Sequence, residues 1–461
     1  MSTFALFFLI LGLGLVGWFA ARARALAFST NSGSRPHSRP NYHGWYVALW
    51  AILPALLFVA IWGSVAPGLV MQATLDSPAA SALPPEGMDR SAILSEVKGL
   101  ADGSVDAAFN PTSDALLPHY LAAQSRYAIM GAALALLLAF AGGAYAFVRV
   151  RPDFRARSRV ERVVMAILLI ASLIAILTTL GIVASLLFES LRFFSKVSPL
   201  EFLFGLTWSP QTAIRADQVG SSGAFGAVPL FWGTIFIGAI IAMIVAIPLG
   251  LMSAIYLTQY AKASVRAWMK PILEILAGVP TVVYGYFAAL TVAPAIRDFA
   301  AAIGIAGASS ESALAAGAVM GIMIIPFVSS MADDSIAAVP QSMRDGSLAM
   351  GATTSETIRK VLVPAALPGV VGGVLLAVSR AIGETMIVVM AAGLAANLTA
   401  NPFASVTTVT TQIVQLLTGD QEFDSAKTLA AFALGLVLFL VTLFLNIVAL
   451  GVVKKYREAY E

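Results

Sequence analysis

Long apolar runs, separated by segments that hold most of the charged residues, constrain the fold of this chain more than any other feature. A helix needs about 20 mostly apolar residues to cross the hydrocarbon core of a bilayer. We predict about nine such helices, at residues 3–20, 45–71, 127–148, 163–188, 230–257, 272–290, 314–331, 369–393 and 430–453. Only 11% of the residues are charged, whereas a soluble domain carries about 25%. The short alternating segments of a transmembrane barrel do not occur, so the sequence predicts an all-α integral membrane protein.

The composition argues against several functional classes. The chain has no cysteine, which excludes disulfides and thiolate metal sites, and its three histidines do not suggest a metal cluster. The net charge of +3 does not indicate nucleic-acid binding, because the basic residues gather in short loops beside the predicted spans. No Gly-x4-Gly-Lys-Ser/Thr phosphate-binding loop occurs. We therefore expect no metal, no catalytic residue and no cofactor bound by this chain, and no enzymatic activity of its own.

Residues 1–162 are predicted to form an N-terminal extension with about three spans. Arg22 and Arg24 follow the first span and no basic residue precedes it, which favours a retained anchor with a periplasmic N-terminus. The polar stretch at 72–126 is rich in Asp and Glu, which predicts a small, partly ordered region on the outer side. A dense basic cluster follows the third span, and we interpret it as a cytoplasmic topology signal or a contact for membrane lipid. Its members are Arg149, Arg151, Arg155, Arg157, Arg159 and Arg162.

Residues 163–461 form one predicted unit of six spans. Basic residues place the C-terminus and the loop after the second of these spans in the cytoplasm. They are Lys262, Arg266, Lys270, Lys454, Lys455 and Arg457. Gly278 and Pro280 predict a kink or a thinning of the third span.

The loop at 333–364 joins two predicted spans and is too long and too patterned for a simple turn. Pro340 suits the first turn of a helix, and Gly351 is placed to end that helix in a left-handed conformation. Thr353 and Glu356 form a capping-box pattern for a second short helix. We expect a helix, a tight turn and a second helix at the cytoplasmic surface. The pattern alone leaves two interpretations open: an interfacial loop without a partner, and a surface that another protein approaches closely.

The same loop resembles the EAA loop of bacterial ABC-importer permeases, which reads Glu-Ala-Ala, three residues, Gly, nine residues, Ile, one residue, Leu-Pro. Gly351 and Pro364 match this pattern outright. The full set of corresponding positions is Asp345, Gly346, Ser347, Gly351, Val361, Val363 and Pro364. Gly346 replaces an alanine and should loosen its helix slightly. The resemblance implies a coupling helix that docks into a groove of an ATPase subunit.

Arg380 and Glu384 place both signs of charge near the middle of the predicted span at 369–393. They are four residues apart, which would put them on one face of a helix. A charged side chain at that depth costs about 2.5–3.5 kcal/mol on insertion scales, which argues against a lipid-facing position. Two compatible interpretations remain open: a structural ion pair, and a lining of the substrate path.

Residues 379–386, Ser-Arg-Ala-Ile-Gly-Glu-Thr-Met, resemble the Arg-Ala-hydrophobic-Gly-Glu-Thr-Met segment of the phosphate-specific ABC permeases of the PstC and PstA type. The resemblance covers residues 163–461, and residues 1–160 resemble the N-terminal extension of a longer subset of PstC proteins. It implies that the last six spans form the permease core of a type I ABC importer. It also implies that Arg380, Glu384 and Thr385 lie on the translocation path.

This resemblance implies the transmembrane permease subunit of an ATP-driven inorganic phosphate importer in a bacterial inner membrane. The implied partners are a PstA-like second permease, an ATPase dimer that binds the ATP, and a periplasmic phosphate-binding protein. A permease for another oxyanion, such as sulfate or molybdate, stays open as an alternative. A secondary transporter is the other alternative, and it predicts inverted repeats, which the sequence does not display.

Overall fold

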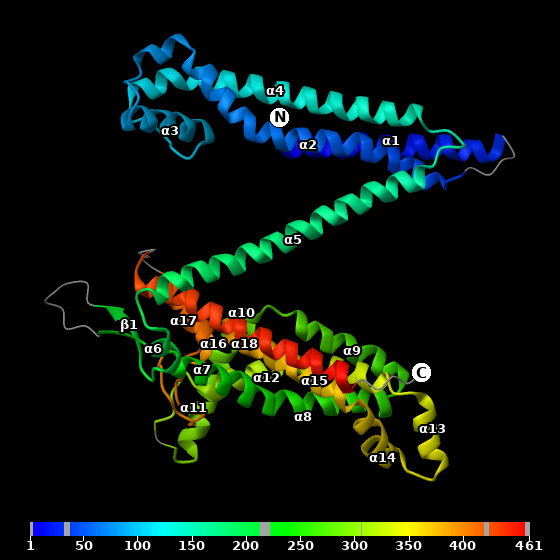
Figure 1. Ribbon diagram of the computed structural model, residues 1–461, viewed down its shortest axis with the longest axis vertical. Coiled ribbons are helices and arrows are strands. Elements are labelled where there is room, and N and C mark those ends of the chain that lie inside the picture. The colour runs from blue at the N-terminus through cyan, green and yellow to red at the C-terminus, as the bar shows by residue number, and fades with distance from the viewer. Residues whose placement is uncertain (1–2, 32–36, 213–221, 306, 419–423, 457–461) are drawn as a thin grey trace. The chain divides into compact units, whose positions relative to one another are not determined.

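The structure is a computed structural model, which describes residues 3–31, 37–212, 222–305, 307–418 and 424–456. The chain divides into two compact units, Met1–Ile176 and Leu177–Glu461. Figure 1 shows that almost every described element is a helix. The predicted all-α class is therefore confirmed, with one two-stranded sheet as the exception in the described chain.

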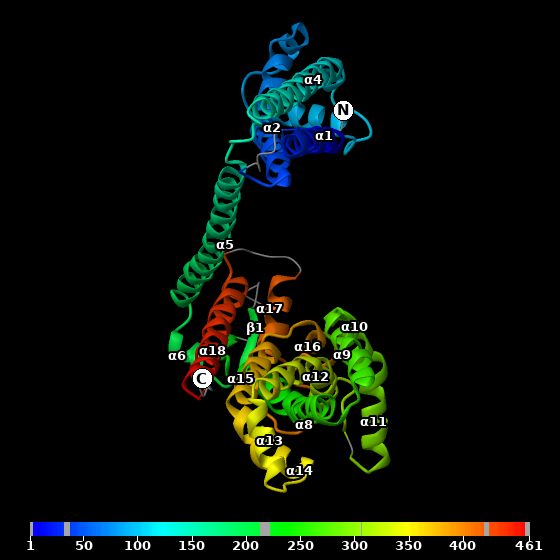
Figure 2. The ribbon, with the colours of Figure 1, turned by 90° about the vertical axis from the view of Figure 1, so that its right-hand side faces the viewer.

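The first unit is a bundle of long helices. It contains α1 (Thr3–Asn31), α2 (Pro40–Leu75), the short 3-10 helix η1 (Pro78–Ala82), α3 (Met88–Asp102), α4 (Pro111–Val148) and the first part of α5 (Ala156–Phe194). Helices α1, α2 and α4 lie side by side (Figures 1 and 2). Ala55, Ala135 and Ala139 are buried between them. Such small side chains let helix backbones approach closely, which is how membrane helices commonly pack.

The acidic segment of this unit is mostly helical. Helix α3 packs on the first turns of α4, and Ile93 and Val97 are buried against Leu116. The carboxylate of Glu96 accepts hydrogen bonds from the hydroxyl of Ser113 at 2.9 Å and from the backbone amides of residues 109 and 110. The loop between α3 and α4 is thus fastened to the middle of α3.

The second unit holds the remaining elements. It begins with the rest of α5, which is followed by α6 (Pro199–Phe204), the antiparallel strands β1 (Trp208–Thr212) and β2 (Ser222–Phe225), α7 (Val228–Thr234), the π-helical turn η2 (Ile235–Ile241), α8 (Ala242–Ile255) and η3 (Tyr256–Tyr260). It continues with α9 (Ala263–Gly278), α10 (Thr281–Phe287), η4 (Ala288–Val292), α11 (Ala293–Ala302) and α12 (Ala313–Ala337). It ends with α13 (Gln341–Ala349), α14 (Thr354–Thr357), η5 (Ile358–Leu362), α15 (Val363–Ile382), α16 (Met386–Ala391), α17 (Val409–Leu417) and α18 (Ala426–Tyr456).

Helix α12 is the central helix of this unit. It packs against α8 and α15, and Val319, Met320 and Ile324 are almost fully buried in the main apolar core. A methyl group added at Gly321 would lie 2.8 Å from the carbonyl oxygen of Ala242. The absence of a side chain at this position therefore sets how closely α12 and α8 can approach.

The spans agree with the predicted number and differ in detail. Eight described helices are long and apolar enough to cross a membrane, and α9 followed by the helical segment Thr281–Ala302 supplies a ninth if this pair counts as one span. The two parts of that pair are bent by 86° at residues 279–280, so the predicted kink is confirmed. The prediction of a span at 369–393 is wrong, because the continuous helix runs over Thr354–Ile382 and ends there.

The two ends of the second unit differ in character. Figure 1 shows α13 and α14 at the same end as the C-terminus of α18, and the strands with α6 and α17 at the opposite end. Trp208 of β1 donates a hydrogen bond to the side chain of Gln412 in α17 at 2.9 Å, which anchors the strands to the helices at that end.

Candidate translocation site and coupling loop

The loop predicted to resemble the EAA motif forms the expected helix, turn and helix. Gly351 follows α13 with a φ of +87°, the left-handed region that glycine adopts without strain. Its amide donates to the carbonyl of Leu348 at 3.0 Å, and the amide of Ala352 donates to the carbonyl of Ser347 at 3.2 Å. These two bonds are the Schellman motif, which satisfies carbonyls at the end of a helix. The sequence prediction for Gly351 is confirmed.

The second arm of the loop begins with the predicted capping box. The hydroxyl of Thr353 accepts from the amide of Glu356 at 3.3 Å, and the Glu356 carboxylate accepts from the amide of Thr353 at 3.0 Å. The two arms are also joined to each other, because the hydroxyls of Ser347 and Thr357 lie 2.9 Å apart. The turn thus has a defined shape without any partner.

The remaining positions of the motif lie where the loop enters the span. Ile358 and Leu362 are buried, and Val361 and Val363 are half-buried. Helix α14, the turn η5 and helix α15 form one uninterrupted helical segment, so Pro364 near the start of α15 does not break it. Consequently, the second arm and the helix that ends at Ile382 are one continuous element.

The first arm has a different environment from the second. No residue of α13 is buried, and Asp345 and Gly346 are exposed. Met350, at the tip of the turn, is 89% exposed. An exposed helix with an apolar tip and a fixed turn is a surface suited to contact with another protein.

The expected relationship between Arg380 and Glu384 is wrong. Helix α15 ends at Ile382 and α16 begins at Met386, so the two residues do not lie on one face of a continuous helix. Arg380 occupies the last turn of α15, whereas Glu384 lies in the break between the two helices. No ion pair joins Arg380 to Glu384 among the described residues. The spacing of four residues suggested such a pair only for a continuous helix, and the helix is broken here.

The break itself is held by a set of polar contacts. The amide of Met386 donates to the Glu384 carboxylate at 3.1 Å, and the hydroxyl of Thr410 in α17 donates to the Glu384 carbonyl at 2.9 Å. Thr385 lies in the same break, with its hydroxyl 3.4 Å from the Gly383 carbonyl. Backbone groups that lie outside a helix and are buried need other hydrogen-bond partners. These contacts show how the protein satisfies part of that requirement.

Sequence reasoning missed the contribution of α17. Thr408, Thr410 and Thr411 are buried, and the hydroxyl of Thr234 in α7 accepts from the amide of Val409 at 3.0 Å. The signal available was the run Thr407-Thr408-Val409-Thr410-Thr411-Gln412, which is polar within an otherwise apolar chain. Of these hydroxyl groups, that of Thr410 reaches the Glu384 carbonyl, and the Thr408 hydroxyl oxygen lies 3.0 and 2.9 Å from those of Thr410 and Thr411.

Arg380 is exposed in the second unit, and its guanidinium makes no hydrogen bond or ion pair with any described residue. The cation therefore stays available to a ligand or to a partner chain. This arrangement brings a free guanidinium, a carboxylate and several hydroxyls to one helix break.

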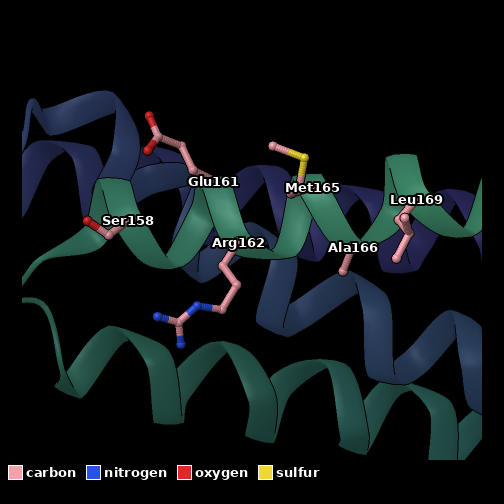
Figure 3. A pocket seen from close by; sticks show the side chains of 6 residues that line it. All are labelled: Ser158, Glu161, Arg162, Met165, Ala166 and Leu169. Carbon is pink, nitrogen blue, oxygen red and sulfur yellow. The ribbon is translucent and has the colours of Figure 1, made fainter.

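A separate hollow lies on α5. It measures about 510 Å³ and is open, and all six residues that line it come from one side of α5 (Figure 3). They are Ser158, Glu161, Arg162, Met165, Ala166 and Leu169. Glu161 already pairs with Arg157 at 2.6 Å. The hollow is the uncovered side of a single helix and contains none of the candidate site residues.

Two family profiles match separate parts of this chain. The profile described as Phosphate ATP-binding cassette transporter matches residues 6–178. The profile described as Binding-protein-dependent transport system inner membrane component matches residues 246–458.

Individual relatives extend this finding over most of their own length. The Probable ABC transporter permease protein YqgH of Bacillus subtilis is 34% identical over 304 residues, which are 66% of this chain and 91% of that protein. The chain belongs to the family of binding-protein-dependent transport permeases. This permease is also 30% identical over 277 residues to the Probable phosphate transport system permease protein PstC of Methanocaldococcus jannaschii, with 58% and 87% of the two chains covered. For the Phosphate transport system permease protein PstC of Mesorhizobium japonicum the identity is 31% over 293 residues, with 60% and 86% covered.

The predicted resemblance to PstC-type permeases is therefore confirmed for both parts of the chain. The permease is a multi-pass membrane protein and a transport subunit of the ABC class, which implies an ATPase partner.

Proposed function

We propose that this permease forms half of the path through which an ATP-driven importer carries inorganic phosphate. A PstA-like second permease supplies the other half, an ATPase dimer supplies the energy, and a periplasmic phosphate-binding protein delivers the anion. The names of the relatives support the cargo, because several of them are called phosphate transport permeases. The permease lies in a bacterial inner membrane with its N-terminus periplasmic and its C-terminus cytoplasmic, and the chemistry of ATP stays in the partner.

The free guanidinium of Arg380 beside the helix break carries this proposal. A guanidinium offers parallel N–H donors to the oxygens of phosphate, and such charge-assisted bonds are about twice as strong as neutral ones. Thr385 adds a hydroxyl group in the same break, and a hydroxyl is a donor of the kind that an oxyanion accepts. Glu384 organises the break through its bond to Met386 and accepts a proton from monobasic phosphate through its second carboxylate oxygen.

The exposed helix α13 supports the second part of the proposal, namely that the loop docks the ATPase. Asp345, Gly346, Ser347 and Gly351 lie on or just after α13, and the positions Val361, Val363 and Pro364 lie on the segment that becomes α15. Because α15 ends beside Arg380, a docking event at α13 and α14 has a continuous helix through which to reach the candidate site.

Uptake by the reconstituted complex tests the proposal. Arg380→Gln and Glu384→Gln should each strongly reduce phosphate uptake while the complex still assembles. Arg297→Gln is the matched control, since Arg297 pairs with its neighbour Asp298 on α11 and takes no part in the site. Wild-type uptake in both site variants would refute the role of the break.

Competition experiments separate the proposed cargo from the alternatives. Excess unlabelled phosphate should displace labelled phosphate, whereas sulfate and molybdate should not. Uptake should also require ATP inside the vesicle and should continue when ion gradients are collapsed. Uptake driven by a gradient without ATP would instead identify a secondary transporter.

A further inference from the structure

Helix α9 is attached to the second unit in an unusual way. None of its residues is buried in the described chain, and Trp268 and Ile275 are 76% and 67% exposed. Apolar packing therefore contributes little to its position. Its strongest side-chain contacts to another helix are ionic, and they reach α12.

Three charged residues make this ionic contact. The carboxylate of Asp333 lies 3.0 and 3.2 Å from one guanidinium nitrogen of Arg266, and 2.8 Å from the ammonium nitrogen of Lys270. Asp333 is 6% exposed, whereas the side chains of Arg266 and Lys270 are 40% and 39% exposed. A buried carboxylate needs such partners, because an unpaired charge in the interior is costly.

The contact region is polar rather than tightly packed. A hollow of about 20 Å³ lies between α9 and α12, with Lys270, Glu274, Ser329 and Asp333 in its lining. This volume suits about one water molecule. The two helices are thus connected by charges across a small gap, which leaves α9 able to move when those charges separate.

The position of this contact links the coupling loop to the helix break. Asp333 lies in the last two turns of α12, which leads directly into α13. Beyond the 86° bend at the other end of α9, the hydroxyl of Tyr284 in α10 donates to the carbonyl of Leu276 at 2.8 Å. Helix α10 then meets α16, since a methyl group added at Gly285 would lie 3.0 Å from the carbonyl oxygen of Met386.

We propose that Asp333, Arg266 and Lys270 form a coupling clamp that makes α9 follow the base of the coupling loop and so transmits its movement through α10 to the break at Gly383–Thr385. The inference rests on the proposed function, because it concerns how ATP hydrolysis in the partner drives transport. Asp333 is a positioning residue in this scheme and does not touch the substrate.

Asp333→Asn in the complete reconstituted importer is the first test, with Asp334→Asn as the matched control. Asp334 is the next residue, is exposed, and forms no ion pair with any described residue. Coupling free energies between sites commonly correspond to factors of about 5–150. We expect Asp333→Asn to lower phosphate uptake per ATP hydrolysed by about fivefold or more, with the ATPase rate close to that of the wild type. Asp334→Asn should leave this ratio unchanged.

A double-mutant cycle shows whether the three residues act as one device. In a complex that carries Arg266→Gln and Lys270→Gln, the further change Asp333→Asn should cause little additional loss, because its partners are already gone. Additive losses would overturn the proposal, as would equal decreases in uptake and ATPase activity, which indicate a structural role alone.

A distance measurement provides a readout that does not depend on uptake. The chain has no cysteine, so spin labels can be placed at Ser264→Cys on α9 and Ser342→Cys on α13. The distance should stay nearly constant between the ATP-bound and ATP-free complexes, and should vary once Asp333→Asn is introduced. A wild-type complex without ATP-driven phosphate uptake would refute the proposed function, whereas full coupling in Asp333→Asn would refute only the clamp.

Discussion

The hydroxyl of Thr410 donates a hydrogen bond to the main-chain carbonyl of Glu384 over 2.9 Å, so a helix 26 residues further along the chain fixes the break between α15 and α16. Helix α15 has already ended at Ile382, so the Glu384 carbonyl does not belong to its regular pattern of backbone hydrogen bonds. The bond thus replaces an interaction that an unbroken helix would supply, and it holds Glu384 and Thr385 in place beside Arg380.

Thr410→Val should weaken the break without changing the size of the side chain. Removing the donor leaves a poorly satisfied carbonyl, which costs about 1–3 kcal/mol in a buried setting. We expect a lower thermal unfolding midpoint in detergent and reduced phosphate uptake. Thr418→Val is the control, because the hydroxyl of Thr418 is exposed and bonds only to carbonyls of the preceding turn. Equal effects of the two changes would contradict the special role of Thr410.

Gly351→Val should disturb the turn between α13 and α14. The φ of +87° is unfavourable for any residue with a Cβ, by about 1–2 kcal/mol, and more for a branched one. The variant should co-purify with less of the ATPase subunit, as measured by pull-down of the tagged permease. Gly346→Ala is the matched control, since a Cβ there meets open space within an ordinary helix and should preserve docking. Normal recovery of the ATPase with Gly351→Val would argue against docking at this turn.

Ile324→Ala should destabilise the second unit, because Ile324 is fully buried at the centre of α12. Large-to-small changes at such sites cost about 2–5 kcal/mol. Ile322→Ala, two residues away on the same helix, should cost much less because Ile322 is 39% exposed. The thermal unfolding midpoints of the two variants give the comparison, and similar midpoints would contradict the central place of α12.

Glu96 should make the acidic segment sensitive to pH. The hydrogen bond from the amide of residue 109, followed by those from Ser113 and Asn110, lowers the pKa of Glu96 below its usual 4.5. A carboxyl group with a lowered pKa in the folded state contributes stability that is complete above the unfolded pKa and disappears as the pH falls through the folded pKa. The difference in unfolding midpoint between the wild type and Glu96→Gln should therefore be constant at neutral pH and shrink below pH 4.5.

Glu86→Gln is the control for this titration, since the exposed Glu86 side chain accepts no hydrogen bond from any described residue. It should shift the midpoint little at any pH. A difference for Glu96→Gln that persists unchanged to the lowest pH would show that the hydrogen bonds of the carboxylate do not set its titration.

The sequence by itself determined those features that depend on residues close together in the chain. Apolar runs of sufficient length must become helices in a bilayer, because every backbone polar group needs an internal partner there. The left-handed Gly351 and the capping box of Thr353 and Glu356 could also be predicted, since their hydrogen bonds close within a few residues.

Only the tertiary structure decided where α15 ends and which groups Glu384 and Asp333 contact. The apolar residues around Gly383 allow an unbroken helix, and the bond from Thr410 that supports the break comes from a distant segment. Asp333 meets Arg266 and Lys270 across more than 60 residues of sequence. Such contacts depend on how helices pack, and no local periodicity or cap encodes them.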